Sequence, residues 1–341
     1  MPNTKLSKLI AAALLYAGFA VYLYQPYFKH FNELRFLVVI NVCLACLGVY
    51  VLSWRWVASF AGSFFAGATY GFGPFALALA GYHPTAGLLV AAVPWLFCPA
   101  VFGPTCGRAK AKWRWVSRLF STLPFLAIIS FFQLSARWRL FAIPVQTKLH
   151  LSDLAFLLAP LAAAERGLTP LGLYHVPMAF LIVGGSMLLA ARRFGTLIIF
   201  AVGVILAFCN PVFNVSPVIW LAIPLLCCSI LIGVGMQGLV CAGFADRKLL
   251  LITAAVMAVL SIITLLLATE CFQVFAGLGA KAGRIFAQAA KMYILGAVAI
   301  TIIFFTVRAK LRIHPLRLTV LCSAAAIDIF LSARFIVDST F

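Results

Sequence analysis

Long apolar runs, each of about 20 residues and separated by short basic clusters, dominate this chain. A helix that crosses the hydrocarbon core of a bilayer needs about 20 predominantly apolar residues. Water does not tolerate so much apolar surface, whereas lipid accepts it and leaves charged residues at the ends of the spans. Only 10% of the residues are charged, against about a quarter in a soluble domain. The sequence therefore predicts an all-α, polytopic integral membrane protein.

We expect about eleven transmembrane helices, within a range of ten to twelve, in one transmembrane domain over residues 1–341. The predicted spans are 9–27, 36–53, 57–81, 85–103, 119–136, 171–191, 195–210, 217–243, 249–270, 288–307 and 317–337. A further apolar stretch, 151–164, is too short to cross unaided. We expect it to form a short interfacial or re-entrant helix within an outer loop over 135–170. In the alternative topology, 151–164 crosses and 119–136 is re-entrant.

Basic clusters predict the sidedness, because loops on the cytoplasmic side are enriched in Lys and Arg. They lie at Arg108, Lys110, Lys112, Arg114 and Arg118, at Arg192 and Arg193, at Arg247 and Lys248, and at Arg308, Lys310, Arg312 and Arg317. If 151–164 does not cross, all of these fall on one side, with the N-terminus in the cytoplasm and the C-terminus outside. Arg137 and Arg139 then lie outside, contrary to the enrichment of Lys and Arg in cytoplasmic loops. Short loops of this kind are typical of a bacterial inner membrane.

The cations outnumber the acidic residues by 26 to 7. They are dispersed in short groups at the ends of apolar runs, where they meet anionic lipid headgroups. We therefore expect anionic lipids as partners, with other membrane subunits as a further option, and no nucleic acid.

Glycine and proline interrupt several predicted spans. Gly67 and Gly71 form a small-xxx-small pair that is followed by Gly73-Pro74, and the next span contains Pro94 and Pro99. Close helix packing accounts for such glycines, and kinks account for the prolines. The alternative is a discontinuous helix in the 67–99 region whose freed backbone groups line a site.

A polar stripe is predicted within an amphipathic basic helix over 271–291. Four residues spaced by three and four share one helical face: Lys281, Arg284, Gln288 and Lys291. Glu270 precedes this stripe, and Asp328 lies in the last span, where a carboxylate usually faces a partner or a cavity. The helix either lies in the outer interface, with its lysines reaching the headgroups, or lines a path for an anionic substrate with Asp328 as an ion-pair partner.

Histidines gather on the outer side of the predicted topology. His83 and His175 each begin a span, and His150 and Asp153 share a face if their segment is helical. Such a group could bind a divalent metal or relay protons to a quinol, although no dense metal motif is present. This pattern argues against haem, because only His175 falls within a predicted span. The cofactor is otherwise unknown.

Three functions remain open from the sequence. The first is a transporter or permease for a small, anionic solute, in which the substrate-binding residues are those of the stripe with Glu270 and Asp328. The second is a non-catalytic subunit of a membrane complex, binding partner helices, lipid or a quinone. The third is a membrane-embedded, metal-dependent hydrolase that uses the outer histidines. The sequence contains no catalytic motif such as G-x-S-x-G, and we therefore favour a function other than catalysis.

Overall fold

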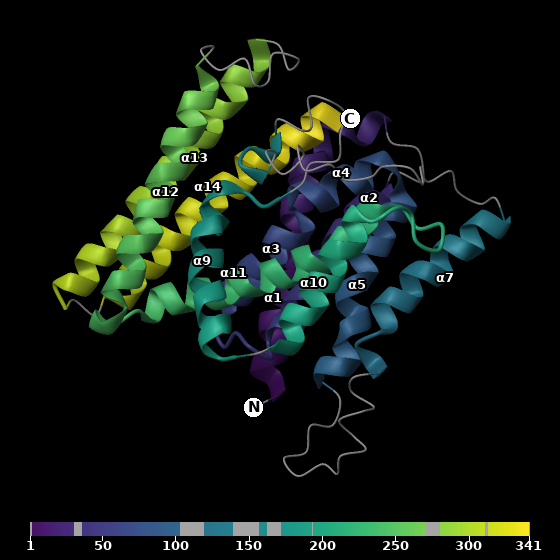
Figure 1. The fold of residues 1–341 in the computed structure, drawn as a ribbon, viewed down its shortest axis with the longest axis horizontal. Coiled ribbons are helices and arrows are strands. Elements are labelled where there is room, and N and C mark those ends of the chain that lie inside the picture. The colour runs from purple at the N-terminus through teal and green to yellow at the C-terminus, as the bar shows by residue number, and fades with distance from the viewer. Residues whose placement is uncertain are drawn as a thin grey trace.

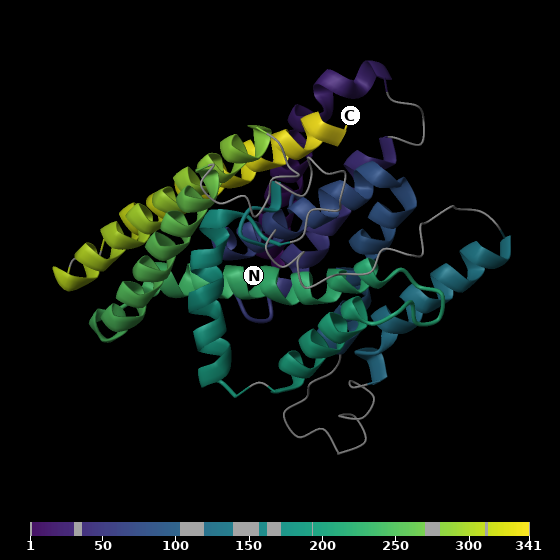
Figure 2. The ribbon, with the colours of Figure 1, turned by 45° about the horizontal axis from the view of Figure 1, so that its top comes forward.

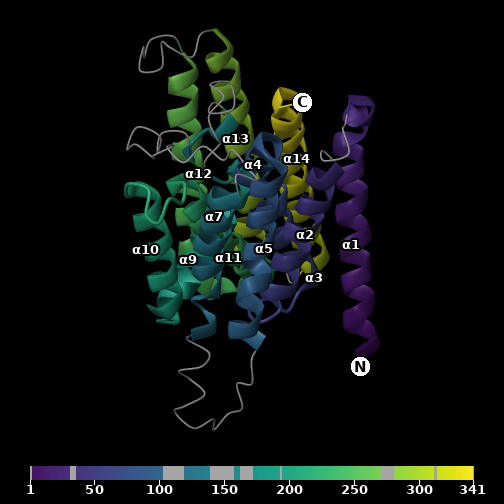
Figure 3. The same cartoon turned by 90° about the vertical axis from the view of Figure 1, so that its right-hand side faces the viewer.

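The computed structural model describes residues 2–30, 36–102, 119–138, 157–161, 172–192, 194–269, 280–310 and 313–340. Across these residues the fold is helical and contains no β-strand. The helices form a bundle in which most members run along one common direction (Figure 3). The predicted all-α membrane class is confirmed, because these helices are long and apolar enough to cross a bilayer.

In the described chain, eight helices meet the length and hydropathy of a membrane span, and three shorter apolar helices accompany them. The long ones are α1 (Pro2–Tyr24) with η1 (Gln25–His30), α2 (Phe36–Ser53), α3 (Phe60–Gly71) with α4 (Pro74–Tyr82), α5 (Pro84–Phe102), η4 (Pro217–Leu221) with α11 (Ala222–Cys241), η5 (Phe244–Asp246) with α12 (Arg247–Ala268), α13 (Ala280–Arg308) and α14 (His314–Thr340). The short ones are α7 (Leu123–Trp138), α9 (His175–Ala190) and α10 (Phe194–Phe208). Each predicted span overlaps one of these helices.

Helices joined by a loop run in opposite directions, with α3 and α4 counted as one segment, and the two ends of the chain lie at opposite ends of the bundle (Figure 1). The end that holds the N-terminus also holds the links between α2 and α3, α9 and α10, α11 and α12, and α13 and α14 (Figures 1 and 3). These links and the adjoining helix ends carry Arg55, Arg192, Arg247 and Lys310. The described basic clusters therefore share one end, as the predicted topology requires; which side of a membrane that end faces stays a prediction.

The discontinuous helix that was the alternative for the 67–99 region occurs at one place. Helix α3 ends at Gly71 and α4 begins at Pro74, so Phe72 and Gly73 interrupt a single membrane-length segment. Backbone that leaves the helix at this depth is tolerated where its polar groups are bonded inside the protein. Residues 60–82 have the largest buried share of all the long apolar segments, which meets that condition.

Helix α5, in contrast, continues through Pro94 and Pro99. Pro94 has no N–H to donate to the carbonyl of Val90, four residues earlier. The hydroxyl of Tyr70 donates to that carbonyl oxygen instead, at 2.9 Å. A side chain from α3 thus replaces the lost helical bond, and this explains why the proline does not end α5.

Helix α11 lies at the centre of the packing and contacts both α3 and α9. Its glycines allow close approach: a Cβ added at Gly235 would overlap the carbonyl oxygen of Phe180 on α9, and one at Gly184 would overlap that of Leu231 on α11. On the other side, a Cβ at Gly233 would lie 2.6 Å from the carbonyl oxygen of Gly62 on α3. The three backbones are therefore in direct contact, in the manner of small-residue interfaces in membranes.

Helices α12 and α13 form a long antiparallel pair at one side of the bundle, next to α14 (Figure 2). Helix α13 begins at Ala280 rather than at 288, so the described part of the predicted amphipathic helix continues without a break into the span. Ile285, Phe286 and Tyr293 bury one face of this helix along its first turns, and that packing supports the extension. Residues 270–279 lie outside the described chain, as does most of the predicted 135–170 loop.

Candidate functional site: a buried histidine–aspartate pair between interrupted helices

Asp328 lies near the middle of α14, and its side chain has no exposed surface. A carboxylate within a bundle of apolar helices is expensive unless it is paired and hydrogen-bonded. Its position halfway along a 27-residue helix puts it far from both ends of the bundle. Asp328 is thus a buried polar centre.

The carboxylate of Asp328 has three donors. The backbone N–H of Val176 donates to its Oδ2 at 2.6 Å, and the hydroxyl of Ser332 donates to its Oδ1 at 3.3 Å. The third partner is the imidazole of His175, whose Nδ1 lies 3.0 Å from Oδ1. Val176 is in the first turn of α9, so Asp328 also caps that helix at the end where the macrodipole favours a negative charge.

His175 is as deeply buried as Asp328, with 0% of its side chain exposed. The edge of its ring meets Tyr293 of α13 with the centroids 4.9 Å apart and the planes at 88°. An ionised carboxylate only accepts hydrogen bonds, so a neutral imidazole that bonds an ionised Asp328 has its proton on Nδ1 and its lone pair on Nε2. Nε2 has no hydrogen-bond partner among the residues that the structure describes.

The pairing also fixes where α9 begins. Since His175 is the first residue of α9 and meets the middle of α14, α9 starts inside the bundle rather than at its surface. Its 16 residues span about 24 Å, short of the roughly 30 Å of a bilayer core. Gly172–Tyr174, which precede it, are not helical. Helix α9 is therefore a short apolar helix that begins inside the bundle.

Two tyrosine hydroxyls connect the interrupted segments. Tyr174, which precedes α9, donates at 2.7 Å to the carbonyl oxygen of Phe72 in the gap between α3 and α4. Tyr293 donates at 3.0 Å to the carbonyl oxygen of Leu158. The gap in α3–α4, the start of α9 and the middle of α14 consequently meet around one buried polar group.

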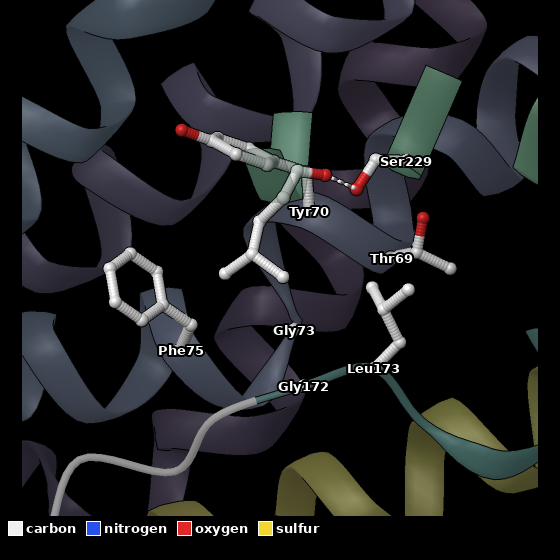
Figure 4. A pocket seen from close by; sticks show the side chains of 8 residues that line it. Thr69, Tyr70, Gly73, Phe75, Gly172, Leu173 and Ser229 are labelled. Atoms are coloured by element: carbon white, nitrogen blue, oxygen red, sulfur yellow. Dashed lines mark hydrogen bonds between the residues drawn. The ribbon is translucent and has the colours of Figure 1, made fainter. Parts of the chain in front are cut away.

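A small cleft lies beside this meeting point. It is lined by residues of the α3–α4 gap, the segment before α9, and α11: Thr69, Tyr70, Gly73, Phe75, Gly172, Leu173, Leu225 and Ser229 (Figure 4). The hydroxyl of Ser229 is engaged with the carbonyl oxygen of Leu225 at 2.8 Å. The cleft has room for about one water molecule. In this conformation, therefore, nothing larger can enter it.

The predicted polar stripe lies on the opposite face of α13 from the residues that this helix buries. Arg284 and Lys291 are exposed and Gln288 is half-buried, whereas Ile285 and Tyr293 are buried. Lys281 lies in the first turn of α13, and Glu270 lies outside the described chain. The structure thus brings Asp328 together with His175 and not with Arg284 or Lys291, and a substrate role for the stripe stays a prediction.

The predicted metal-binding residues are only partly described. His83 caps α4, and its Nδ1 lies 2.6 Å from the hydroxyl of Thr85. His175 pairs with Asp328, while His150 and Asp153 lie outside the described residues. Where side chains are placed, no group of three or more metal-ligating residues occurs. The four-residue metal site therefore stays a prediction.

A second buried charge, Arg317, belongs to a basic cluster expected at the membrane surface, yet only 5% of the residue is exposed. Its guanidinium donates to the carbonyl oxygen of Ala242 at 2.7 Å and of Val240 at 3.4 Å. Its Nε donates to the hydroxyl of Thr306 at 3.1 Å. Arg317 thus bonds the carbonyl end of α11 from inside the bundle, where the sequence analysis had placed it among groups that face lipid headgroups.

Sequence reasoning selected both His175 and Asp328 but assigned them to separate groups. They are 153 residues apart, so no local spacing signals the contact. The one available signal was that each is a rare ionisable residue inside an apolar run. No family model, no curated protein and no solved structure matches this chain.

Proposed function

We propose that this protein is a transporter for a small, anionic solute, and that the His175–Asp328 pair is the polar centre of its transport path. The observation that carries the proposal is a fully buried carboxylate and imidazole, paired at 3.0 Å where the gap of one helix and the start of another meet. A bundle whose only task is to stay folded gains little from such a pair. Apolar residues of similar volume serve stability as well or better.

The geometry resembles what alternating transport requires. In discontinuous helices the ends of the half-helices point toward the middle of the bundle, where their uncompensated backbone groups can hold a substrate or a coupling ion. Asp328 already occupies the start of α9. The start of α4 differs, because Gly73 offers no side-chain cap and the first turn leaves the N–H groups of Phe75 and Ala76 without intrahelical acceptors.

These N–H groups support the choice of an anion. The N-terminal end of a helix attracts negative charge through its dipole and its free donors. Gly73 and Phe75 also line the small cleft (Figure 4), whose wall includes Leu173, two residues before His175. Because that cleft holds about one water in this conformation, the transported solute requires the surrounding helices to move apart.

The test compares two aspartates of α14. Asp328 is buried, whereas Asp338 is about half exposed and bonds Tyr27 and Arg334 near the end of the helix. Wild-type protein, Asp328→Asn and Asp338→Asn are reconstituted into proteoliposomes and incubated with a metabolite extract, and the trapped compounds are identified by mass spectrometry. We expect one or a few carboxylates or phosphate esters to accumulate with wild type and Asp338→Asn, and not with Asp328→Asn.

The proposal is wrong if no compound accumulates above empty liposomes, or if Asp328→Asn accumulates the same compounds as wild type. Gel filtration of each variant in detergent verifies that it is folded before reconstitution. The same purification addresses the subunit hypothesis, since a stoichiometric companion protein would favour a complex and a single species would not.

A further inference from the structure

We propose that Nε2 of His175 binds the proton that drives transport, so that the anion and one proton move together. This inference rests on the proposed function and adds the coupling ion to it. It starts from the one nitrogen of the buried pair that has no partner in the described chain, Nε2, on a side chain with 0% exposure.

The hydrogen bonds around Asp328 decide which ring nitrogen is open. The backbone N–H of Val176 and the hydroxyl of Ser332 both donate to the carboxylate, which is the arrangement that an ionised acid prefers. Nδ1 of His175 is therefore protonated, and the lone pair of the neutral ring lies on Nε2. A proton from water can add to this lone pair without breaking any other bond, and the ring then becomes an imidazolium.

Charge balance favours that addition in an apolar bundle. With a neutral imidazole the buried pair carries a net charge of about −1, and with an imidazolium its net charge is about 0. Burial penalises net charge more than it penalises a contacting ion pair with complementary hydrogen bonds. The protonated pair has one unsatisfied hydrogen-bond donor, because the new Nε2–H has no protein acceptor among the described residues.

An anionic solute supplies that acceptor. A carboxylate or phosphate oxygen at Nε2 would accept the hydrogen bond, and its charge would be offset by the proton that the ring has taken up. A bound proton therefore raises the affinity for the anion, and a bound anion raises the affinity for the proton by the same factor. This reciprocal effect is what couples the two ligands. A proton alone leaves a buried donor unsatisfied, and an anion alone adds a second negative charge.

Among the side chains that the structure describes, few other titratable groups face the ring from the helices packed against α9. Helix α14 contributes Asp328, and α13 contributes Tyr293. The cations Arg284 and Lys291 of α13 are exposed on its other face. Helix α12 carries ionisable side chains only at its start, Arg247 and Lys248, and α11 carries only the thiols Cys227, Cys228 and Cys241. Tyr174 of the preceding segment is bonded to Phe72. His175 is thus the group that takes the proton.

The first experiment needs no solute, because its probe is the proton. The chain has five histidines, so replacing His30, His83, His150 and His314 with Gln leaves His175 as the single ¹⁵N-histidine signal in bilayers. We expect solid-state NMR to show a neutral Nδ1–H ring at high pH and an imidazolium at low pH. In the Asp328→Asn variant of this background we expect less imidazolium under the acidic conditions where the parent shows it, because the partner carboxylate is gone. If the fourfold variant does not fold, the difference spectrum between wild type and His175→Gln gives the same information.

The second experiment uses the proteoliposomes and the metabolite extract, with and without an acidic exterior. For one proton moved with one monovalent anion, a gradient of about one pH unit supports about tenfold accumulation, since one pH unit and a tenfold concentration ratio correspond to the same free energy. We expect His175→Gln to abolish this gradient-driven accumulation. We expect His314→Gln, which changes an exposed histidine at the start of α14, to keep it.

The outcomes separate the two proposals. Uptake that does not respond to the pH gradient, or a His175 ring that stays neutral at all pH values, overturns the coupling role while transport stands. A ring that takes up a proton in a protein that accumulates nothing overturns the transport function and the coupling with it. Equal gradient-driven uptake by wild type and His175→Gln also overturns the assignment.

Discussion

The hydroxyl of Tyr174 donates a 2.7 Å hydrogen bond to the carbonyl oxygen of Phe72, and the bond joins two non-helical segments that are 102 residues apart. Phe72 lies where α3 gives way to α4, and Tyr174 immediately precedes α9. One buried contact therefore holds both irregular segments beside the His175–Asp328 pair. Moving either segment requires this bond to break or to find a new partner.

The variant Tyr174→Phe tests that contact. It removes only the hydroxyl and leaves the carbonyl oxygen of Phe72 without its donor, so we expect unfolding in detergent to be easier by about 1–3 kcal/mol. Tyr82→Phe is the control, because Tyr82 is 60% exposed and we expect no measurable change. Thermal unfolding followed by circular dichroism compares the two. Equal stability of Tyr174→Phe and wild type would contradict a structural role for this bond.

The contact between α9 and α11 can be tested with two consecutive glycines of α9. A Cβ at Gly184 would overlap the carbonyl oxygen of Leu231, whereas one at Gly185 would meet nothing within 4 Å. We expect Gly184→Ala to destabilise the protein by about 1–3 kcal/mol, because the helices must separate. Gly185→Ala should be neutral or slightly stabilising, since alanine is the better helix former. The midpoint of thermal unfolding distinguishes them, and the reverse order would refute the packing.

Arg317 offers a further comparison within α14. Arg317→Met removes the donors to Ala242, Val240 and Thr306 and leaves carbonyl groups of α11 unbonded inside the bundle. We expect a loss of about 2–4 kcal/mol from the several charged hydrogen bonds. Arg334→Met is the control: its ion pair with Asp338 at 3.6 Å is about half exposed and is worth about 0–1 kcal/mol. Comparable losses in both variants would contradict the buried role.

The sidedness is tested with an epitope tag at each end of the chain. The two ends lie at opposite ends of the bundle (Figure 1), and the described basic clusters share the end of the N-terminus. Because basic loops stay in the cytoplasm, we expect protease added outside sealed cells to remove the C-terminal tag alone. Removal of the N-terminal tag alone would invert the topology, and removal of both or neither would contradict an odd number of crossings.

The fold class and the positions of the apolar helices were predictable because both depend on the length of apolar runs, which is local information. The break at Phe72–Gly73 was predictable as a region but not as a residue, since glycine and proline mark many positions that stay helical. Pro94 shows why: its helix continues because Tyr70, on another helix, bonds the carbonyl oxygen of Val90. Such compensation depends on the tertiary structure.

The sequence singled out the residues of the candidate site but not the contact between them. Asp328 and His175 stood out as ionisable residues within apolar runs, but their contact spans 153 residues and has no local periodicity. The stripe on α13 was visible because its spacing is local, yet the helix presents Arg284 and Lys291 away from its buried face. Arg317 was grouped with its sequence neighbours, whereas its length lets it reach inward to the end of α11.

The start of α9 inside the bundle has a consequence for how the chain is assembled. His175 leaves the ribosome 153 residues before Asp328, and at a synthesis rate of roughly 5–20 residues per second that gap lasts about 8–30 s. Throughout this interval the imidazole of His175 lacks its partner, the carboxylate of Asp328. Helix α9, with 16 residues, is also too short to hold its place across a bilayer. We therefore expect α9 to reach its final depth only after α14 has been inserted. Assembly of the protein then ends with the docking of α9 against α14 and not with the release of the chain from the ribosome.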